Sequence, residues 1–71
     1  MITALRLART KTGKTMRHFA REHGFAETAL CRIERGQAYI PEKWRQRLAS
    51  SLQIGIDELC DERGWPRFIK S

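Results

Sequence analysis

The sequence predicts a small all-α domain built from five short helices. Apolar side chains recur at helical spacing in five segments, and a glycine, a proline or a capping threonine separates these segments. No segment alternates apolar and polar residues as a half-buried strand does. The 71 residues allow one domain at most. We therefore expect a helical domain over residues 1–62 and a C-terminal tail over residues 63–71.

Two glycines end the first two predicted helices. We expect the first helix over residues 3–12, because Gly13 follows it and can adopt a left-handed conformation. Thr15 is a suitable N-cap for the second helix, since its hydroxyl can accept a hydrogen bond from a free amide of the first turn. Gly24 ends that helix. Residues that share one side are Ile2, Leu5, Ala8 and Arg9 in the first helix and Met16, Phe19, Ala20 and His23 in the second.

The other three helices have comparable boundaries. The third begins at Ala26 and Glu27 and closes at Gly36, whereas Pro41 favours the first turn of the fourth. A short fifth helix begins near Asp57, and residues beyond it end the regular structure. Residues spaced for the core in the third helix are Ala29, Leu30 and Ile33. The apolar stripe of the fourth helix is Ile40, Trp44, Leu48 and Leu52, and the short fifth helix contains Ile56, Leu59 and Cys60.

Positive charge is concentrated in the first two thirds of the chain. The formal net charge is +6, with 14 Lys plus Arg against 8 Asp plus Glu. Residues 1–47 hold 11 basic and 4 acidic side chains, whereas residues 48–71 hold 3 basic and 4 acidic ones. This distribution favours contact between the first part of the chain and a polyanion. Solubility alone is the alternative explanation of the charge.

Several classes of function lack their sequence signatures. No run of about 18 apolar residues is present to cross a membrane, and Arg6, Arg9 and Lys11 interrupt any signal-peptide core. Cys31 and Cys60 do not make a disulfide framework, which favours a reducing, cytoplasmic location. We find no nucleophile–base pair, metal-ligand cluster or phosphate loop. We therefore expect a protein that is not an enzyme and that has no cofactor, no metal and no small-molecule ligand.

Residues 15–36 have the layout of two short helices joined by a glycine turn. With their flanks they form an ordered series of caps, glycine turns and apolar pairs, which ends in Ile-Glu-x-Gly and then in apolar-Asp-Glu-Leu. The members of the series are Arg9, Gly13, Thr15, Phe19–Ala20, Gly24–Phe25, Ile33–Gly36, Pro41, Leu48–Ala49, Leu52 and Ile56–Leu59. This order runs without a gap from about residue 4 to residue 60. It resembles the helix-turn-helix domain of the Cro/cI-like (XRE-type) phage-repressor family.

The resemblance implies a five-helix, lambda-repressor-like fold and a function in transcription regulation. The chain would be a cytoplasmic, sequence-specific regulator that binds double-stranded DNA, a Cro-like repressor of a phage or mobile element. An antitoxin that binds a toxin partner and represses its own operon is the alternative, although residues 61–71 are short for a toxin-binding tail. RNA binding agrees with the charge, but no sheet with exposed aromatic residues is expected to stack bases.

Some positions have a structural role in this interpretation. Arg9 and Glu34 are expected to form a partly buried ion pair, so we interpret Arg9 as a structural residue rather than a DNA contact. Met16 stands where the family usually has a glutamine that holds the DNA backbone, so Arg17 would take over part of that contact. His23 replaces a leucine and is expected to be a partly buried histidine at the helix end, with a pH switch as the alternative.

The fourth helix also departs from the family pattern. Glu42 and Arg45 stand where leucines are usual. We expect Ile40 and Trp44 to supply the missing packing, which leaves the rotation of this helix open.

Four residues of the third helix are the candidates for reading bases in the major groove. Arg32 can donate two hydrogen bonds to guanine O6 and N7. Glu27 can accept from a cytosine amine, or it can be a first-turn residue that complements the helix dipole. Thr28 can contact a thymine methyl or a phosphate. Cys31 can pack on a thymine methyl or can simply fill space on the groove-facing side.

Phosphate contacts are expected from the start of the second helix and from the loop between the third and fourth helices. Lys14 and Arg21 are weaker candidates, and His18 is expected to lie in solvent or near a phosphate. The residues assigned to the DNA backbone are Thr15, Arg17, Arg35, Gln37, Tyr39 and Lys43.

The C-terminal third carries more apolar side chains than one small core can use. The resemblance implies a homodimer, and the low charge of residues 48–71 suits a dimer interface. Such a dimer would bind a pseudo-palindromic operator with half-sites roughly 34 Å apart. In the alternative, Trp65 and Phe68 fold back onto the chain's own core. The residues assigned to the dimer interface are Ile54, Ile56, Trp65 and Phe68.

Overall fold

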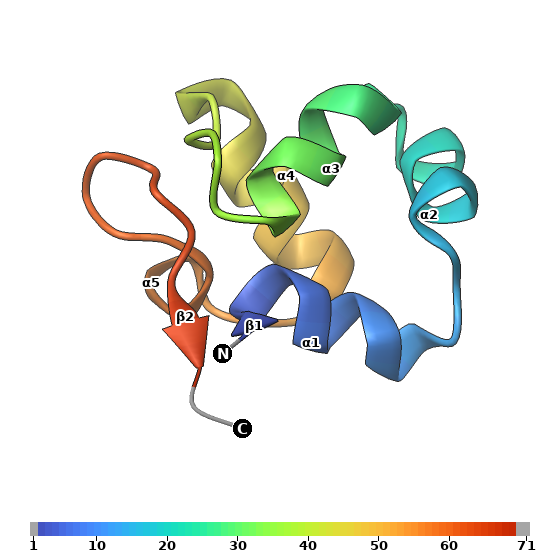
Figure 1. Cartoon of the computed structure of the whole chain (residues 1–71), viewed down its shortest axis with the longest axis horizontal. Helices are drawn as coiled ribbons and strands as arrows, with labels where there is room; N and C mark the ends of the chain where they lie inside the picture. The colour runs from blue at the N-terminus through green and yellow to red at the C-terminus, as the bar shows by residue number, and fades with distance from the viewer. Residues whose placement is uncertain (1, 70–71) are drawn as a thin grey trace.

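The chain folds into five helices and one small antiparallel sheet, and the computed structural model describes residues 2–69. Figure 1 shows the helices wrapped around a common centre, with the first and last described residues side by side. The predicted number of helices is confirmed. In chain order the elements are β1 (Ile2–Thr3), α1 (Ala4–Thr12), α2 (Met16–His23), α3 (Glu27–Glu34), α4 (Glu42–Leu52), α5 (Ile56–Leu59) and β2 (Phe68–Ile69).

The helix ends follow from local chemistry, with two small corrections to the predicted bounds. Thr3 is the N-cap of α1 rather than its first residue, because its side chain accepts a hydrogen bond from the Arg6 amide. Thr15 caps α2 in the same way by accepting from the His18 amide. Pro41 precedes α4 and occupies its N-cap position instead of its first turn. Gly13 and Gly24 end α1 and α2 with φ of 76° and 73°, a conformation that a Cβ atom disfavours.

The expectation that the chain has no strand was wrong. Strands β1 and β2 pair antiparallel, with Ile2 opposite Ile69 and Thr3 opposite Phe68. The amide of Ala4 extends the pairing by donating to the carbonyl of Arg67 at 2.8 Å. Two-residue strands are too short to show alternation, and their partners lie at opposite ends of the sequence. Part of the expected tail is therefore bonded to the start of the first helix, whereas its residues 70–71 lie outside the described part of the chain.

A tight hairpin precedes β2 where the sequence predicted only an end of regular structure. Cys60 and Pro66 form an isolated bridge, and the Asp61 amide donates to the Trp65 carbonyl at 3.0 Å. The Gly64 amide in turn donates to the Asp61 carbonyl at 3.0 Å. We refer to residues 60–66 as the hairpin.

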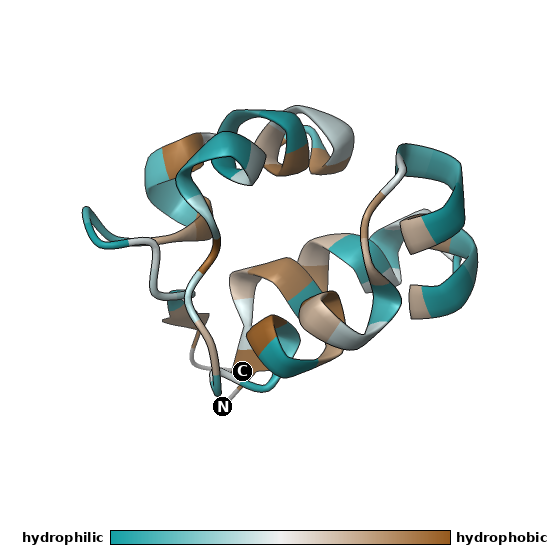
Figure 2. Ribbon diagram, turned by 90° about the horizontal axis from the view of Figure 1, so that it is seen from above, coloured by the Kyte–Doolittle hydropathy of each residue, from teal (hydrophilic) through white to brown (hydrophobic). Residues whose placement is uncertain are grey.

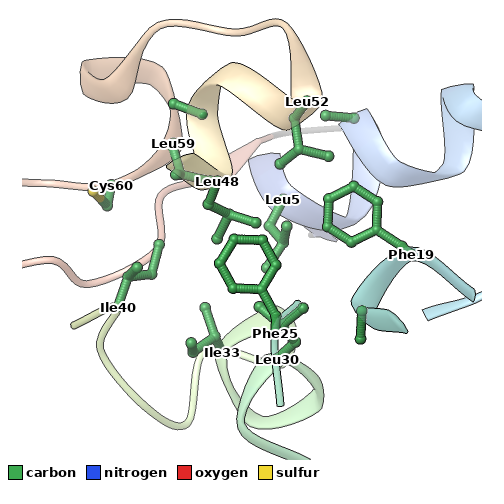
Figure 3. Close-up of a cluster of buried hydrophobic side chains, with 13 residues drawn as sticks. Leu5, Phe19, Phe25, Leu30, Ile33, Ile40, Leu48, Leu52, Leu59 and Cys60 are labelled. Atoms are coloured by element: carbon green, nitrogen blue, oxygen red, sulfur yellow. The ribbon is translucent and has the colours of Figure 1, made fainter. Parts of the chain in front are cut away.

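The core takes side chains from all five helices (Figure 3). Ile40 is fully buried just before α4, and Trp44 packs against the core from its first turn, so both supply the packing expected of them. Figure 2 shows apolar segments on the inner sides of the helices and polar segments on the outer sides. Each fully buried large apolar side chain contributes about 1.5–3 kcal/mol to folding. The buried set is Leu5, Ala8, Phe19, Ala20, Phe25, Leu30, Ile33, Ile40, Leu48, Ala49, Leu52, Leu59 and Cys60.

An ion pair joins α1 to the end of α3, as the sequence predicted. Arg9 Nε and Nη2 donate to the two carboxylate oxygens of Glu34 at 2.8 and 3.1 Å. The side chains are only 15% and 14% exposed. This hydrogen bonding raises the pKa of Arg9 above its ordinary value. Arg9 Nη1 also donates to the Lys14 carbonyl at 2.7 Å, so the guanidinium has a structural role within the fold.

Candidate nucleic-acid interface

Helices α2 and α3 are joined by a turn that several contacts hold in place. The Phe25 amide donates to the Ala20 carbonyl at 2.8 Å, and the Phe25 side chain is buried. Its ring packs against Phe19 and, edge on, against Trp44 at a centroid distance of 5.3 Å. The guanidinium of Arg47 lies over the Phe25 ring, 4.7 Å from its centroid. The turn is thus anchored in the core, and α3 is held in a defined orientation relative to α2.

One side of α3 is buried and the other faces solvent. Leu30 and Ile33 are buried to 0% and 1% exposure, and they face the core. Thr28, Arg32 and Arg35 are exposed. Their spacing of four and three residues puts them on one face of the helix. Three of the predicted DNA-contacting residues therefore lie together on the solvent side.

Glu27 and Cys31 border this face rather than occupy its centre. Glu27 is exposed in the first turn of α3, where its charge complements the helix dipole whatever else it contacts. Cys31 is half-buried and lines a small hollow with Ile2, Arg6 and Phe68. It is therefore the least accessible of the four residues assigned to base reading.

Helix α2 presents two exposed arginines, Arg17 in its first turn and Arg21 in its last turn. The Thr15 hydroxyl accepts from the His18 amide at 3.1 Å, which leaves its own proton available to a further acceptor. Arg17 and Arg21 line a shallow hollow with Thr15, His18 and Glu22. Within residues 2–69 no ion pair engages either arginine. Their charges are therefore available to an outside partner.

Lys14 is placed differently, because Glu22 compensates its charge. The Lys14 ammonium and the Glu22 carboxylate form an ion pair on the surface. Glu22 also lies 3.6 Å from His18 Nε2 and 3.1 Å from His23 Nε2. The hydrogen bond from Lys14 lowers the pKa of Glu22 below its ordinary value, and the two histidines act in the same direction. The His23 side chain is 28% exposed, as expected for a partly buried residue at a helix end.

The loop between α3 and α4 continues the exposed surface. Arg35, Gln37 and Lys43 are exposed, as a phosphate contact requires. Tyr39 is 56% exposed, and its ring lies 6.0 Å from that of Trp65 in the hairpin. Figure 1 shows α3 with α2 at one end and this loop at the other, so the candidate residues follow one border of the fold.

Other arginines of the chain donate hydrogen bonds to its own backbone, which the sequence did not reveal. Arg47 donates to the His23 carbonyl at 2.8 Å and covers Phe25. Arg45 donates to the carbonyls of Ile40 and Arg63 at 2.9 and 3.0 Å. One signal was present for Arg45, which stands in α4 at a position where an apolar packing residue is usual. No signal separated Arg47, which is itself exposed, from the cations that make no such bond.

The four residues assigned to a dimer interface do not form one patch. Ile54 and Phe68 line an apolar groove between α1, the end of α4 and β2. Trp65 instead contacts Tyr39, and Ile56 is 41% exposed on α5. Trp65 and Phe68 are 43% and 49% exposed. Neither belongs to the buried core, although Phe68 packs closely enough on Gly36 that a Cβ atom there would meet its ring.

Within residues 2–69, no helix is long and apolar enough to cross a membrane, and no group of three His, Cys, Asp or Glu residues is arranged to hold a metal ion. Comparison with protein-family models, curated proteins and solved structures gives no match. The function is therefore inferred from the residues and their geometry.

Proposed function

We propose that the chain is a sequence-specific, double-stranded DNA-binding transcriptional regulator, a Cro-like repressor with a lambda-repressor-like fold. In this proposal α2 and α3 are the two helices of a helix-turn-helix. One observation carries it: the solvent side of α3 presents Thr28, Arg32 and Arg35, while its other side is anchored in the core. A helix held in this way can enter a major groove without rearranging.

The roles of the residues follow from their chemistry and exposure. Arg32 lies on the outer face of α3 and donates two hydrogen bonds to guanine O6 and N7. Thr28, one turn earlier, contacts a thymine methyl or a neighbouring phosphate. Glu27 accepts from a cytosine amine at the start of the helix, where a carboxylate without such a partner would be repelled by phosphates.

Phosphate contacts flank α3 on both sides. Arg17 and Thr15 lie at the start of α2, and Arg35, Gln37 and Lys43 lie at the end of α3 and beyond it. Such contacts fix the position of the helix on the duplex and supply most of the affinity. If each subunit of a homodimer neutralises about four phosphates, the log–log dependence of affinity on salt has a slope near −7.

The operator would be pseudo-palindromic, because a two-fold dimer presents two copies of α3. The half-sites would then lie roughly 34 Å apart, one turn of the duplex. In this proposal, the bound dimer represses transcription by occluding its operator.

A pair of matched variants tests the proposed DNA-binding face. Arg32→Ala and Lys11→Ala each remove one exposed helical cation, the first on α3 and the second on α1. We expect Arg32→Ala to weaken binding to the selected operator at least about tenfold and Lys11→Ala to change it less than about twofold. Fluorescence anisotropy with labelled duplexes measures both. Equal effects would contradict the assignment of α3 as the DNA-binding helix.

A further inference from the structure

The end of α3 closes with a sharp turn of the backbone. The Gly36 amide donates to the Ile33 carbonyl and the Gln37 amide to the Arg32 carbonyl, both at 2.9 Å. Gly36 has a φ of 77°, which lets the chain leave the helix at this point. Arg32 lies on the last turn of α3 and Arg35 directly follows it. The orientation of both cations therefore depends on how this end of the helix is held.

One contact that holds this end is a buried hydroxyl. Thr3 is 1% exposed, and its hydroxyl donates to the Glu34 carbonyl at 2.8 Å. The same oxygen accepts from the Arg6 amide at 3.1 Å, so its proton and a lone pair are both used. Removing a partner from a buried polar group costs free energy. Thr3 thus ties β1 and the start of α1 to the last residue of α3.

A second contact comes from the ring of Phe68, which lies opposite Thr3 in the pairing of β1 with β2. The ring packs on the backbone that follows α3, since a Cβ atom at Gly36 would meet it. Phe68 also lines the hollow that contains Cys31 and Arg35. The sequence assigned Phe68 to a dimer interface, whereas these contacts give it a role within its own chain.

The strand that carries Phe68 is itself anchored just before that residue. The Arg67 amide donates to the Leu59 carbonyl at 3.1 Å, and Arg67 Nε donates to the Asp57 carbonyl at 2.6 Å. The Arg67 carbonyl accepts from the Ala4 amide at 2.8 Å. These bonds tie β2 to α5 and to the start of α1 (Figure 1). The strand therefore reaches the end of α3 from a fixed position.

We propose that β2 is a positioning element for α3, in which Phe68 and its strand partner Thr3 fix the helix end that carries Arg32 and Arg35. The contact is a property of the chain without DNA. Its consequence, that β2 sets how sharply α3 discriminates between DNA sequences, rests on the proposed function. A bidentate hydrogen bond to a base needs a defined orientation of its donor, whereas phosphate contacts carry no sequence information. Loosening α3 should therefore reduce discrimination more than it reduces the affinity for random duplex.

Hydrogen exchange of backbone amides, followed by NMR on the full chain without DNA, tests the positioning contact. We expect Phe68→Ala to speed exchange at Gly36 and Gln37 at least about tenfold and to change the Phe25 amide less than about twofold. Phe68→Leu keeps an apolar side chain against Gly36 and should restore most of the protection. Leu7→Ala is the matched control, because Leu7 lines the apolar groove with Phe68 but not the hollow beside α3. If Phe68→Ala speeds exchange at Gly36 and Gln37 no more than Leu7→Ala does, the proposal is overturned.

A second pair of variants tests the hydroxyl. Thr3→Val keeps the shape of the side chain but removes the donor to the Glu34 carbonyl, whereas Thr3→Ser keeps the donor. We expect Thr3→Val to speed exchange at Gly36 and Gln37 at least about fivefold, and Thr3→Ser to keep most of the protection. Equal rates in the two variants would contradict the role of Thr3.

A DNA readout separates the positioning of α3 from the proposed function. On duplexes with a single half-site, Phe68→Ala should lower the ratio of operator to random affinity at least about fivefold and leave the random affinity within about twofold. A wild type that prefers no sequence would contradict the proposed function, while the exchange rates would still support the positioning contact. A wild type that prefers its operator, together with a Phe68→Ala variant that loosens α3 but discriminates equally well, would overturn the link between β2 and DNA reading.

Discussion

Two groups of arginines have the same charge but different surroundings. Arg17 and Arg32 belong to the exposed face of α2 and α3, whereas Arg45 and Arg67 lie at the seam, where the hairpin and the segment after it meet the helices. At the seam, Arg45 donates to the Ile40 and Arg63 carbonyls, and Arg67 donates to the Asp57 carbonyl at 2.6 Å. On the face, Arg17 and Arg32 are exposed and take part in no ion pair within residues 2–69. A count of charges treats all four alike.

The difference separates arginines that bond to the protein's own backbone from arginines that face solvent. Arginines at the seam donate to backbone carbonyls of other segments, so their removal should affect stability. Arginines on the face satisfy nothing within the described chain, so their removal should affect an outside partner. The division predicts a loss of stability for changes at the seam and a loss of binding for changes on the face.

Gly64→Ala should destabilise the seam most. Gly64 has a φ of 90°, and a Cβ atom there would lie 2.6 Å from the Ile40 carbonyl oxygen and would also meet the Arg45 guanidinium. We expect a loss of about 3 kcal/mol in the free energy of unfolding, measured by urea denaturation. Gly13→Ala is the control, because Gly13 has a φ of 76° but a Cβ atom there would meet nothing within 4 Å. The control should lose only about 1 kcal/mol, and equal losses would show that the seam does not confine Gly64.

Glu34→Gln should cause the next largest loss of stability. It removes the charge that compensates Arg9, whose side chain is only 15% exposed, and leaves an amide that accepts more weakly. We expect the free energy of unfolding to fall by about 2 kcal/mol. Glu22→Gln, which alters an exposed ion pair, is the control and should have a much smaller effect. A stability unchanged by Glu34→Gln would show that the pair does not hold α1 to α3.

Arg32→Ala and Arg17→Ala should differ in kind. Both should leave the unfolding midpoint unchanged. Arg32→Ala should lower the affinity about tenfold, roughly 1.4 kcal/mol, for duplexes that carry the preferred base pair, and should lower it little for random duplex. Arg17→Ala should weaken all duplexes alike and reduce the magnitude of the salt slope by about 1. Competition binding at two salt concentrations measures both, and equal losses of Arg32→Ala on operator and random DNA would remove its base-reading role.

The smallest expected effect is the pH-dependent contribution of the exposed Glu22 to stability. Lys14 holds the pKa of Glu22 below its ordinary value, so the folded state binds this proton less readily than the unfolded state. The resulting stabilisation is present above the unfolded pKa and is lost as pH falls through the folded one. Lys14→Met should raise the pKa of Glu22, as followed by NMR titration of its carboxylate carbon. An unmoved pKa would show that Lys14 is solvated instead of paired.

Much of the fold could be predicted because its signals are local. Gly13, Thr15 and Gly24 mark helix ends by their own backbone and side-chain chemistry, and the structure uses them so. The Arg9–Glu34 pair was also predicted and is confirmed. Strand β2 was missed because its strand partner lies 65 to 67 positions away, near the start of the chain.

The candidate site could be predicted in part. The exposure of Thr28 and Arg32 follows from helical spacing once Leu30 and Ile33 are assigned to the core. The half-burial of Cys31 and the pairing of Tyr39 with Trp65 do not, because both depend on where the C-terminal segment folds back. Sequence spacing decides which face a residue is on, but tertiary contacts decide what covers that face.

Selection of bound sequences from a random duplex pool, at about physiological salt, tests sequence-specific DNA binding by α3 most directly. We predict an enriched inverted repeat with half-site centres about one helical turn apart, and loss of that enrichment at one position of each half-site in Arg32→Ala. A pool that shows no enrichment, with binding that vanishes as salt rises, would contradict the account and leave a basic surface that does not read sequence.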